Sequence, residues 1–387
     1  IATSYDGINW QGRGKDIFTT SGEGIACNTK REHKITFPAN RTLIVGTPTS
    51  ENFTIAYSSN DINTWIGVST PLTEINDIVW NGYLWVAVGN INNNGVTIIV
   101  SSNGIDWTEI DNTIFTIKGN RISWNGSIWI AVGKGTTNTI AYSYDGYHWI
   151  GLGTDIAFGT LEDGGRSIAW NGLLHQWVAV GSTFSSIYYS DNGIVWTPAA
   201  SDIFGSQGTF GIATNNIMWV ALGNNLISNI SATYTIAYSY DGINWRGANN
   251  NPFSTVDTNT YGLDVAWNGS RWVAIGHGNA FSIAYSDDGI NWTGALAATT
   301  ATSHMKSISW NGSLWIAVGG NGLANSEFQM KYSSDGITWT SSNNSIRAQL
   351  PPTGNKVAWN SAHIGHVTIN HPIVAACEDI TLNNSGS

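Results

Sequence analysis

The sequence predicts an all-β fold built from repeated four-stranded antiparallel units. Two short phrases carry this prediction, because each recurs along the chain and each has the pattern of two strands joined by a tight turn. A third observation agrees: no stretch of useful length has the 3.6-residue hydrophobic period of a helix.

The first phrase is Ile-Ala-Tyr-Ser-Asp-Asp-Gly-Ile-Asn-Trp at residues 283–292, which predicts a strand, an Asp-Gly turn and a second strand ending at tryptophan. Asp-Gly between two strands favours a hairpin, because glycine tolerates the positive φ of a tight turn. The phrase recurs about every 42–55 residues. Its copies are Ser4–Trp10, a looser version at Ser58–Trp65, Ser101–Trp107, Ser143–Trp149, Ser190–Trp196, Ser239–Trp245, Ser286–Trp292 and Ser333–Trp339.

The second phrase lies upstream of the first in each repeat, as in Asp-Val-Ala-Trp-Asn-Gly-Ser-Arg-Trp-Val-Ala-Ile-Gly at residues 264–276. It predicts a strand, an Asn-Gly turn and another strand. Its other copies are Asp77–Gly89, Arg121–Gly133, Ser167–Gly181, Gly211–Gly223 without the Asn-Gly turn, Ser307–Gly319, and two degenerate ones at Gly24–Gly46 and Lys356–Ile369.

Four strands per repeat at this spacing are typical of a β-propeller. Each phrase has eight copies, so we expect eight blades in a single domain, with seven blades and a stray terminal segment as the alternative. Because the chain opens with an Asp-Gly hairpin, we expect a composite blade from both termini to close the ring. The expected units are residues 11–65, 66–107, 108–149, 150–196, 197–245, 246–292 and 293–339, and a closing blade of 340–387 with 1–10.

Tryptophan supports a structural interpretation of the repeats. All 20 tryptophans stand at the end of an Asp-Gly phrase, before the Asn-Gly turn or at the start of the strand that follows it. Large rings at fixed strand positions are suited to filling the space between blades, so we expect them in the core.

Composition limits the classes of partner. Hydrophobic residues make up 42% of the chain and charged residues only 11%, with a formal net charge of −10 and a pI near 5.1. An acidic chain does not favour nucleic acid, and no stretch approaches the 18 apolar residues of a membrane span. Low charge and several Asn-x-Ser/Thr sequons favour an extracellular or virion-surface location. Cys27 and Cys377 are either two buried thiols or a disulfide joining the two ends of the chain.

The Ser-x-Asp-Gly-x-x-Trp pattern resembles the Asp-box, the repeat of bacterial neuraminidases, although here the aspartate directly precedes the glycine. The match is cleanest at Ser143–Trp149, Ser239–Trp245, Ser286–Trp292 and Ser333–Trp339. The tryptophan-rich variant is also similar to repeats of large DNA viruses of protists and of exported proteins of marine organisms. The resemblance implies a propeller in which the serine and aspartate close the turn, away from any active site. It assigns structural turn roles to Asp6, Asp145, Asp241, Asp288 and Asp335.

Strand order predicts which face of the propeller binds a ligand. Both tight turns of every unit lie on one face, and the long, dissimilar connections lie on the other, where binding residues usually occur. Residues that enter the first strand of each unit should surround the central channel on this second face. The candidates are Asp77, Arg121, Arg166, Phe210, Tyr261, Asp264, His304, Lys306 and Lys356; the alternative is a solvated rim whose charges pair with one another.

Motifs for catalysis or cofactor binding do not occur in the sequence. It has no nucleophile elbow, phosphate-binding loop or dinucleotide fingerprint. His363, His366 and His371 lie close together but match no zinc spacing. We therefore expect no catalytic residues, no metal and no cofactor.

Three functions are compatible with these observations. The first is a non-enzymatic, lectin-like propeller that binds a glycan or a protein receptor. The second is a structural module of a virion or surface layer, including a homo-oligomer. The third is a sialidase-like glycosidase, but that resemblance requires an arginine triad and a Tyr–Glu nucleophile pair. Only Arg121, Arg166 and Arg347 are available on the loop-bearing face, and no Tyr–Glu pair can be identified.

Overall fold

The computed structural model describes most of the repeat region of the chain. The described residues are 2–3, 11–12, 41–47, 53–58, 65–110, 114–154, 158, 164–182, 187–200, 203–204, 208–224, 234–253, 260–278, 280–297, 305–319, 329–341 and 353–360. The chain divides into two compact units, one of Pro38–Ser361 and one of Ile1–Phe37 with Ala362–Ser387. Within the described residues, no helix has the length and apolar character needed to cross a membrane.

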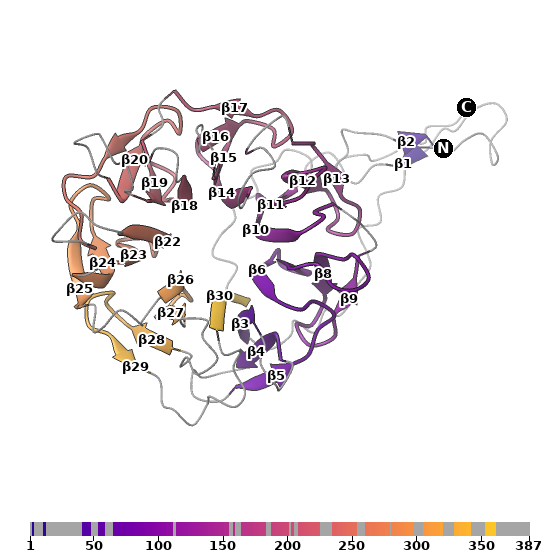
Figure 1. The fold of residues 1–387 in the computed structure, drawn as a ribbon, viewed down its shortest axis with the longest axis horizontal. Helices are drawn as coiled ribbons and strands as arrows, with labels where there is room; N and C mark the ends of the chain where they lie inside the picture. The colour runs from indigo at the N-terminus through magenta and orange to yellow at the C-terminus, as the bar shows by residue number, and fades with distance from the viewer. Residues whose placement is uncertain are drawn as a thin grey trace, which may run out of the picture. The chain divides into compact units, whose positions relative to one another are not determined.

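The larger unit is a closed ring of seven four-stranded antiparallel sheets (Figure 1). The first strand of each sheet is the innermost, and each innermost strand contacts those of both neighbouring blades, so the ring has no gap. These strands are β6 (Ile75–Trp80), β10 (Lys118–Trp124), β14 (Gly165–Asn171), β18 (Thr209–Thr214), β22 (Tyr261–Trp267), β26 (Met305–Trp310) and β30 (Thr353–Asn360).

The other three strands of each blade follow outward in order. The second strands are β7 (Trp85–Gly89), β11 (Trp129–Lys134), β15 (Gln176–Gly181), β19 (Trp219–Gly223), β23 (Trp272–His277), β27 (Trp315–Gly319) and β3 (Arg41–Thr47). The third are β8 (Ile98–Ser101), β12 (Ile140–Ser143), β16 (Ile187–Ser190), β20 (Ile236–Ser239), β24 (Phe281–Ser286), β28 (Gln329–Ser333) and β4 (Ile55–Ser58). The outermost are β9 (Thr108–Glu109), β13 (Ile150–Gly151), β17 (Thr197–Pro198), β21 (Arg246–Gly247), β25 (Thr293–Ala297), β29 (Thr340–Ser341) and β5 (Ile66–Val68).

The Asp-Gly turns are held by the side chains that the repeat supplies. In the β20–β21 turn, the Ser239 hydroxyl accepts a hydrogen bond from the Gly242 N–H at 2.9 Å. Asp241 Oδ1 accepts from the N–H groups of Ile243 and Asn244, and Gly242 has a φ of 70°. Equivalent networks form around Asp145, Asp288 and Asp335, three of the residues to which the sequence assigns a turn role. Asp6 lies outside the described residues.

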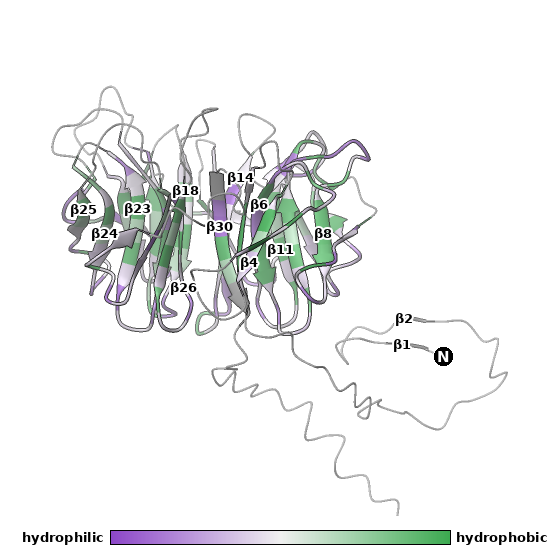
Figure 2. Ribbon diagram, turned by 90° about the horizontal axis from the view of Figure 1, so that it is seen from below, coloured by the Kyte–Doolittle hydropathy of each residue, from purple (hydrophilic) through white to green (hydrophobic). Residues whose placement is uncertain are grey.

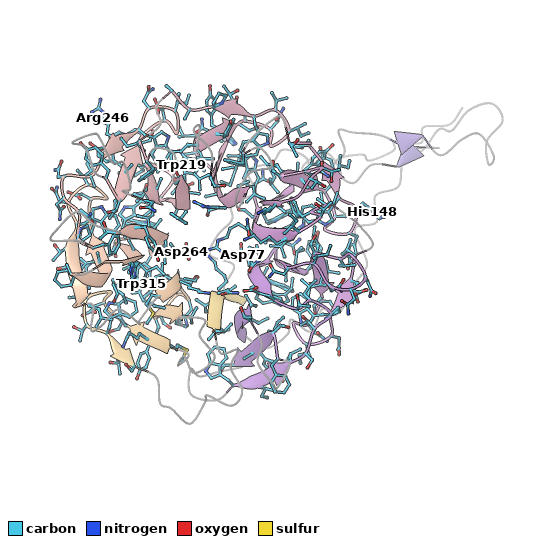
Figure 3. All side chains as sticks on the ribbon, viewed as in Figure 1. Asp77, His148, Trp219, Arg246, Asp264 and Trp315 are labelled. Atoms are coloured by element: carbon cyan, nitrogen blue, oxygen red, sulfur yellow. The ribbon has the colours of Figure 1, made fainter. Side chains whose placement is uncertain are left out.

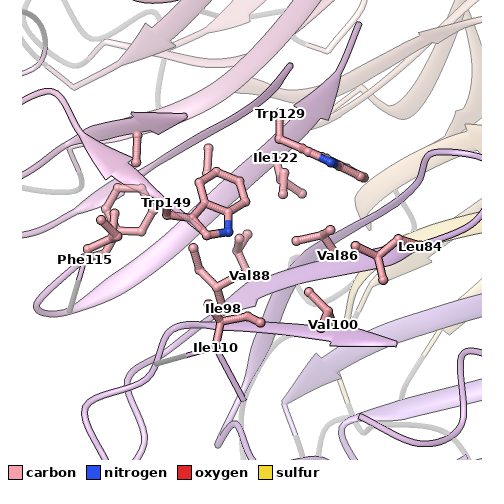
Figure 4. Packing of buried hydrophobic residues seen from close by; sticks show 13 residues of the cluster. Leu84, Val86, Val88, Ile98, Val100, Ile110, Phe115, Ile122, Trp129 and Trp149 are labelled. Atoms are coloured by element: carbon pink, nitrogen blue, oxygen red, sulfur yellow. The ribbon is translucent and has the colours of Figure 1, made fainter. Parts of the chain in front are cut away.

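The predicted burial of tryptophan is confirmed at the start of the second strands, whereas the described tryptophans before the Asn-Gly turn, such as Trp80 and Trp124, are half-buried and pack against the core. Trp85, Trp129, Trp177, Trp219, Trp272 and Trp315, at the start of the second strands, are fully buried, and Trp65 is 1% exposed. Each lies in an apolar cluster; the one around Trp129 and Trp149 contains side chains of the β6–β9 blade and of its neighbour (Figure 4). Burying side chains of this size between blades stabilises each interface by several kcal/mol, on the order of 1.5–3 kcal/mol for each large apolar residue.

The predicted count of eight blades was wrong, and the alternative of seven is confirmed. β30 pairs with β3 along its whole length, so the two degenerate copies of the Asn-Gly phrase contribute strands to one blade rather than two. The closing blade is composite, as expected, but its members are β30 with β3, β4 and β5, not residues 340–387 with 1–10. In the smaller unit, β1 (Ala2–Thr3) pairs antiparallel with β2 (Gln11–Gly12).

Candidate functional site

Every innermost strand carries a β-bulge near its beginning. At this point one residue of each strand has no partner on the second strand. A bulge of this kind changes the direction in which the side chain of the extra residue points. Figure 2 shows hydrophilic residues near the beginning of β6, β14 and β30, whereas the middle of most strands is apolar. The bulge residues are Asn76, Asn120, Arg166, Phe210, Leu263, Lys306 and Asn355.

Three of these bulge residues are asparagines that tie neighbouring blades together. The Asn76 amide donates to the Gly119 carbonyl of the next blade at 2.9 Å, and the Asn120 amide donates to the Gly165 carbonyl at 2.8 Å. Asn355 likewise donates to the Ile75 carbonyl at 3.1 Å. On this side of the ring the bulge serves inter-blade packing.

The other four bulge residues lie on consecutive blades and are not amides. The Arg166 guanidinium carbon lies 4.2 Å from the centre of the Phe210 ring, and the Phe210 and Tyr261 rings lie 5.7 Å apart. Tyr261 in turn stacks on His277 at 5.0 Å, because the two are cross-strand partners of β22 and β23. One continuous stack, which we call the axial stack, is thus formed by two of the bulge residues, Arg166 and Phe210, together with Tyr261 and His277. Each of its side chains is half-buried.

Lys306 lies on the next blade beyond the axial stack and has a neutral partner. Its ammonium donates to Asn355 Oδ1 at 3.1 Å. The Asn355 amide donates to Glu74 Oε1 at 2.8 Å, so this asparagine bridges the lysine and the glutamate. Burial lowers the pKa of Lys306, and the charge of Glu74 offsets this only in part.

A second tier of charged residues directly follows the bulges. Figure 3 shows Asp77 and Asp264 nearest the middle of the ring, while His148 and Arg246 lie at its outer edge. Asp77 Oδ2 accepts from the Ile122 N–H of the next blade at 2.9 Å, and Asp264 Oδ2 accepts from the Ile308 N–H at 3.2 Å. Both aspartates are buried, at 2% and 4% exposure. They therefore join blades and do not present a surface to a ligand.

The environments of the two aspartates shift their pKa values in opposite directions. Burial raises the pKa of Asp77, and the charges of Lys356 and Arg121 offset this only in part. Burial acts in the same direction on Asp264, but the pKa of Asp264 is lowered because Lys356, Arg121 and the Ile308 N–H together outweigh it. Asp264 also forms an ion pair with Lys356, and their charged atoms lie 3.2 Å apart.

The structure thus brings most of the predicted site residues to the ring axis and divides them between two roles. Arg166, Phe210 and Lys306 at the bulges, and Tyr261 at the beginning of β22, are half-buried, whereas Asp77, Arg121, Asp264 and Lys356 form the tier between blades. Arg121 donates to the Asn76 carbonyl at 3.2 Å. The predicted His304, Cys27 and Cys377 lie outside the described residues.

Sequence reasoning missed the bulge asparagines, Glu74 and His277. A signal for the bulge exists: two consecutive residues, such as Asn76-Asp77 or Asn355-Lys356, interrupt the alternation of the strand before its Ile or Val. His277 follows the glycine that ends the second phrase, and no pattern marks it. In the described part of the chain, no group of three or more His, Cys, Asp or Glu is arranged to hold a metal ion.

Comparisons with known proteins support the fold alone. No family model matches the chain, and no curated protein matches it. A candidate 6-phosphogluconolactonase from Bacteroides uniformis is similar in structure with a TM-score of 0.59 and 13% identity, covering 84% of this chain and 100% of that one. A second one, from Bacteroides fragilis, has a TM-score of 0.57 and 12% identity over 84% of this chain and 99% of that one. At this identity the similarity identifies a propeller and does not transfer an activity.

Proposed function

We propose that the ring is a non-enzymatic recognition module that binds a carbohydrate at the axial stack. The observation that carries the proposal is that the residue at the bulge is not the same on every blade of the ring. Asparagine occupies the bulge on three adjoining blades and ties each to the next, whereas half-buried Arg166 and Phe210 occupy it on β14 and β18 and belong to the stack.

Aromatic rings and a few fixed polar groups are the usual lining of a site for a small ligand. The members of the stack lie on the rigid strands β14, β18, β22 and β23 rather than on connections, so the ligand meets a preorganised surface. The guanidinium of Arg166, the hydroxyl of Tyr261 and the imidazole of His277 supply hydrogen-bonding groups suited to sugar hydroxyls.

The positions of the two axial carboxylates support a function in which the carbohydrate is bound but not hydrolysed. A glycosidase needs two carboxyl groups that reach the scissile bond, one as an acid and one as a base or nucleophile. Asp77 and Asp264 are buried, and each accepts a hydrogen bond from the backbone of the next blade.

A glycan array with the whole chain, followed by calorimetry on the best hit, tests this proposal. We expect Phe210→Ala and His277→Ala to weaken binding about tenfold or more at nearly unchanged Tm, since both side chains are half-buried. Tyr240→Ala is the matched control, because Tyr240 is 56% exposed in the tight turn between β20 and β21 and should leave binding unchanged. Absence of any glycan hit, or loss of binding in the control alone, would overturn the proposal.

A further inference from the structure

The charges of the ring are segregated between its innermost strands and its turns. The innermost strands carry Lys118, Arg121, Arg166, Lys306 and Lys356, but only two carboxylates, Asp77 and Asp264. The tight turns between the third and fourth strands carry Asp106, Asp145, Asp191, Asp241, Asp287, Asp288 and Asp335. In a chain with a net charge of −10, the axis is therefore a local cationic region.

The two axial carboxylates do not neutralise Lys306. Asp264 pairs with Lys356, and Asp77 accepts from the backbone of β10. Among the described residues, the ammonium of Lys306 has no ion-pair partner, and its hydrogen bond goes to the neutral amide oxygen of Asn355.

Asn355 also binds the carboxylate of Glu74, whose charge acts on Lys306 and offsets part of the effect of burial on its pKa. Glu74 is held by the Asn355 amide at 2.8 Å, the Asn90 amide at 2.6 Å and the Thr47 hydroxyl at 2.6 Å. Three neutral donors thus fix the glutamate, and the lysine is positioned without being paired. A half-buried ammonium in this setting gains more from a bound anion than an exposed one does, because water screens it less.

Building on the proposed carbohydrate function, we propose that the ligand of the axial stack carries an oxyanion, a carboxylate or a sulfate, which binds to Lys306. The sugar rings contact the stack, and the anionic group takes the ammonium position that the carboxylates in the described part of the chain leave unpaired. Neutral glycans lack this contact and bind more weakly.

The test begins with an array of carboxylated, sulfated and neutral oligosaccharides bound to the whole chain. We expect the hits to be predominantly anionic, and the carboxylated and sulfated arms to identify the group. The best hit is then compared by calorimetry with its methyl-esterified or desulfated form. The neutral form should bind about tenfold more weakly, since a hydrogen bond to a charged group contributes about 1.5–3 kcal/mol.

Lys306→Met should weaken binding of the anionic form to the level of the neutral form and leave the neutral form unaffected. Lys331→Met is the matched control, because Lys331 is also half-buried, with a neutral partner in Ser341 at 2.9 Å, but lies on β28, the third strand of its blade, away from the axis. Hits that are neutral, lost in Phe210→Ala and indifferent to Lys306→Met would overturn this inference and retain the proposed function. The absence of any hit would overturn both.

Discussion

The ammonium of Lys356 lies 3.2 Å from the carboxylate of Asp264, although the two residues are 92 positions apart in the chain. Lys356 belongs to β30, the strand that closes the ring, and Asp264 to β22, two blades away. The pair therefore spans the intervening strand β26 and connects the closing strand to the body of the ring. Both side chains are largely buried, with 20% and 5% exposure.

Removing one partner of this pair should destabilise the ring. Lys356→Met leaves the buried Asp264 carboxylate without its ammonium, and breaking a buried ion pair in this way costs about 3–5 kcal/mol. Urea unfolding at pH 7 measures the change in the free energy of unfolding. The double variant with Asp264→Asn should lose less than the sum of the two single variants, because no isolated charge remains. Single variants that unfold like the parent chain would contradict this role.

Asp77→Asn should have the opposite effect to Asp264→Asn. The pKa of Asp77 is raised, mainly by burial, so its carboxylate costs stability increasingly as the pH rises through that pKa. An asparagine carries no charge and can still accept from the Ile122 N–H. We expect Asp77→Asn to raise the free energy of unfolding at pH 7 and to have little effect below pH 3.8, the ordinary value of an aspartate.

For Asp264→Asn, the free energy of unfolding should fall at pH 7. The lowered pKa of Asp264 contributes stability above the ordinary value, and this contribution disappears as the pH falls through the lowered value. Chemical denaturation at pH 7 and pH 3 separates the two variants. Effects of the same sign at both positions would contradict the opposite directions of the two pKa shifts.

The blade could be predicted from the sequence because its determinants are local. An Asn-Gly or Asp-Gly turn is held by hydrogen bonds within about four residues, as between Asn268 Oδ1 and the N–H groups of Ser270 and Arg271. The closure of the ring is not local. β30 and β3 are distant segments without a turn between them, so a count of phrases assigns each its own blade.

For the site, the sequence predicts where the residues lie better than it predicts what each of them does. Strand order places Arg166, Phe210 and Tyr261 at the axis, and the structure agrees. Their stacking depends on the bulge and on the spacing between blades, which are tertiary features. Asp264 illustrates the limit: the sequence suggests a ligand-contacting charge, whereas the fold buries it at 4% exposure beside Lys356.

Replacing the aspartates of the Asp-Gly turns with asparagine should reduce the loss of stability in acid. Partial burial acts to raise the pKa of Asp288, but N–H donors of Asn291 and Ile290 and the Ser286 hydroxyl outweigh it and lower the pKa to about 2. The pKa values of Asp241 and Asp335 are also about 2. Stability from a lowered pKa is present above the ordinary value and is lost as the pH falls toward 2.

The triple variant Asp241→Asn/Asp288→Asn/Asp335→Asn should therefore show a smaller decrease in Tm between pH 4 and pH 2 than the parent chain. Asparagine is compatible with the turn, because Asn103 Oδ1 accepts from the N–H groups of Ile105 and Asp106 in the equivalent position. A pH dependence identical to that of the parent chain would mean that these carboxylates do not contribute to acid stability.

Substitutions at two glycines of one blade distinguish the effect of backbone strain on stability from the effect of packing. Gly312, in the turn between β26 and β27, has a φ of 94° and open space around the position of a Cβ. Gly336, in the turn between β28 and β29, has a φ of 75°, but a Cβ there would lie 2.9 Å from Val273 Cγ2 and 3.1 Å from Trp315 Nε1. Both substitutions with alanine incur the strain of a positive φ, about 1–2 kcal/mol.

Gly336→Ala should in addition force the Trp315 ring or the Val273 side chain of the preceding blade to move, and overpacking of this kind costs about 1–3 kcal/mol more. We therefore expect the free energy of unfolding to fall by about 1–2 kcal/mol for Gly312→Ala and by about 2–5 kcal/mol for Gly336→Ala. Urea denaturation of the two variants measures the difference. Equal losses would mean that the glycine of the Asp-Gly turn is required only for its φ, and that the tight contact between this turn and the neighbouring blade does not contribute.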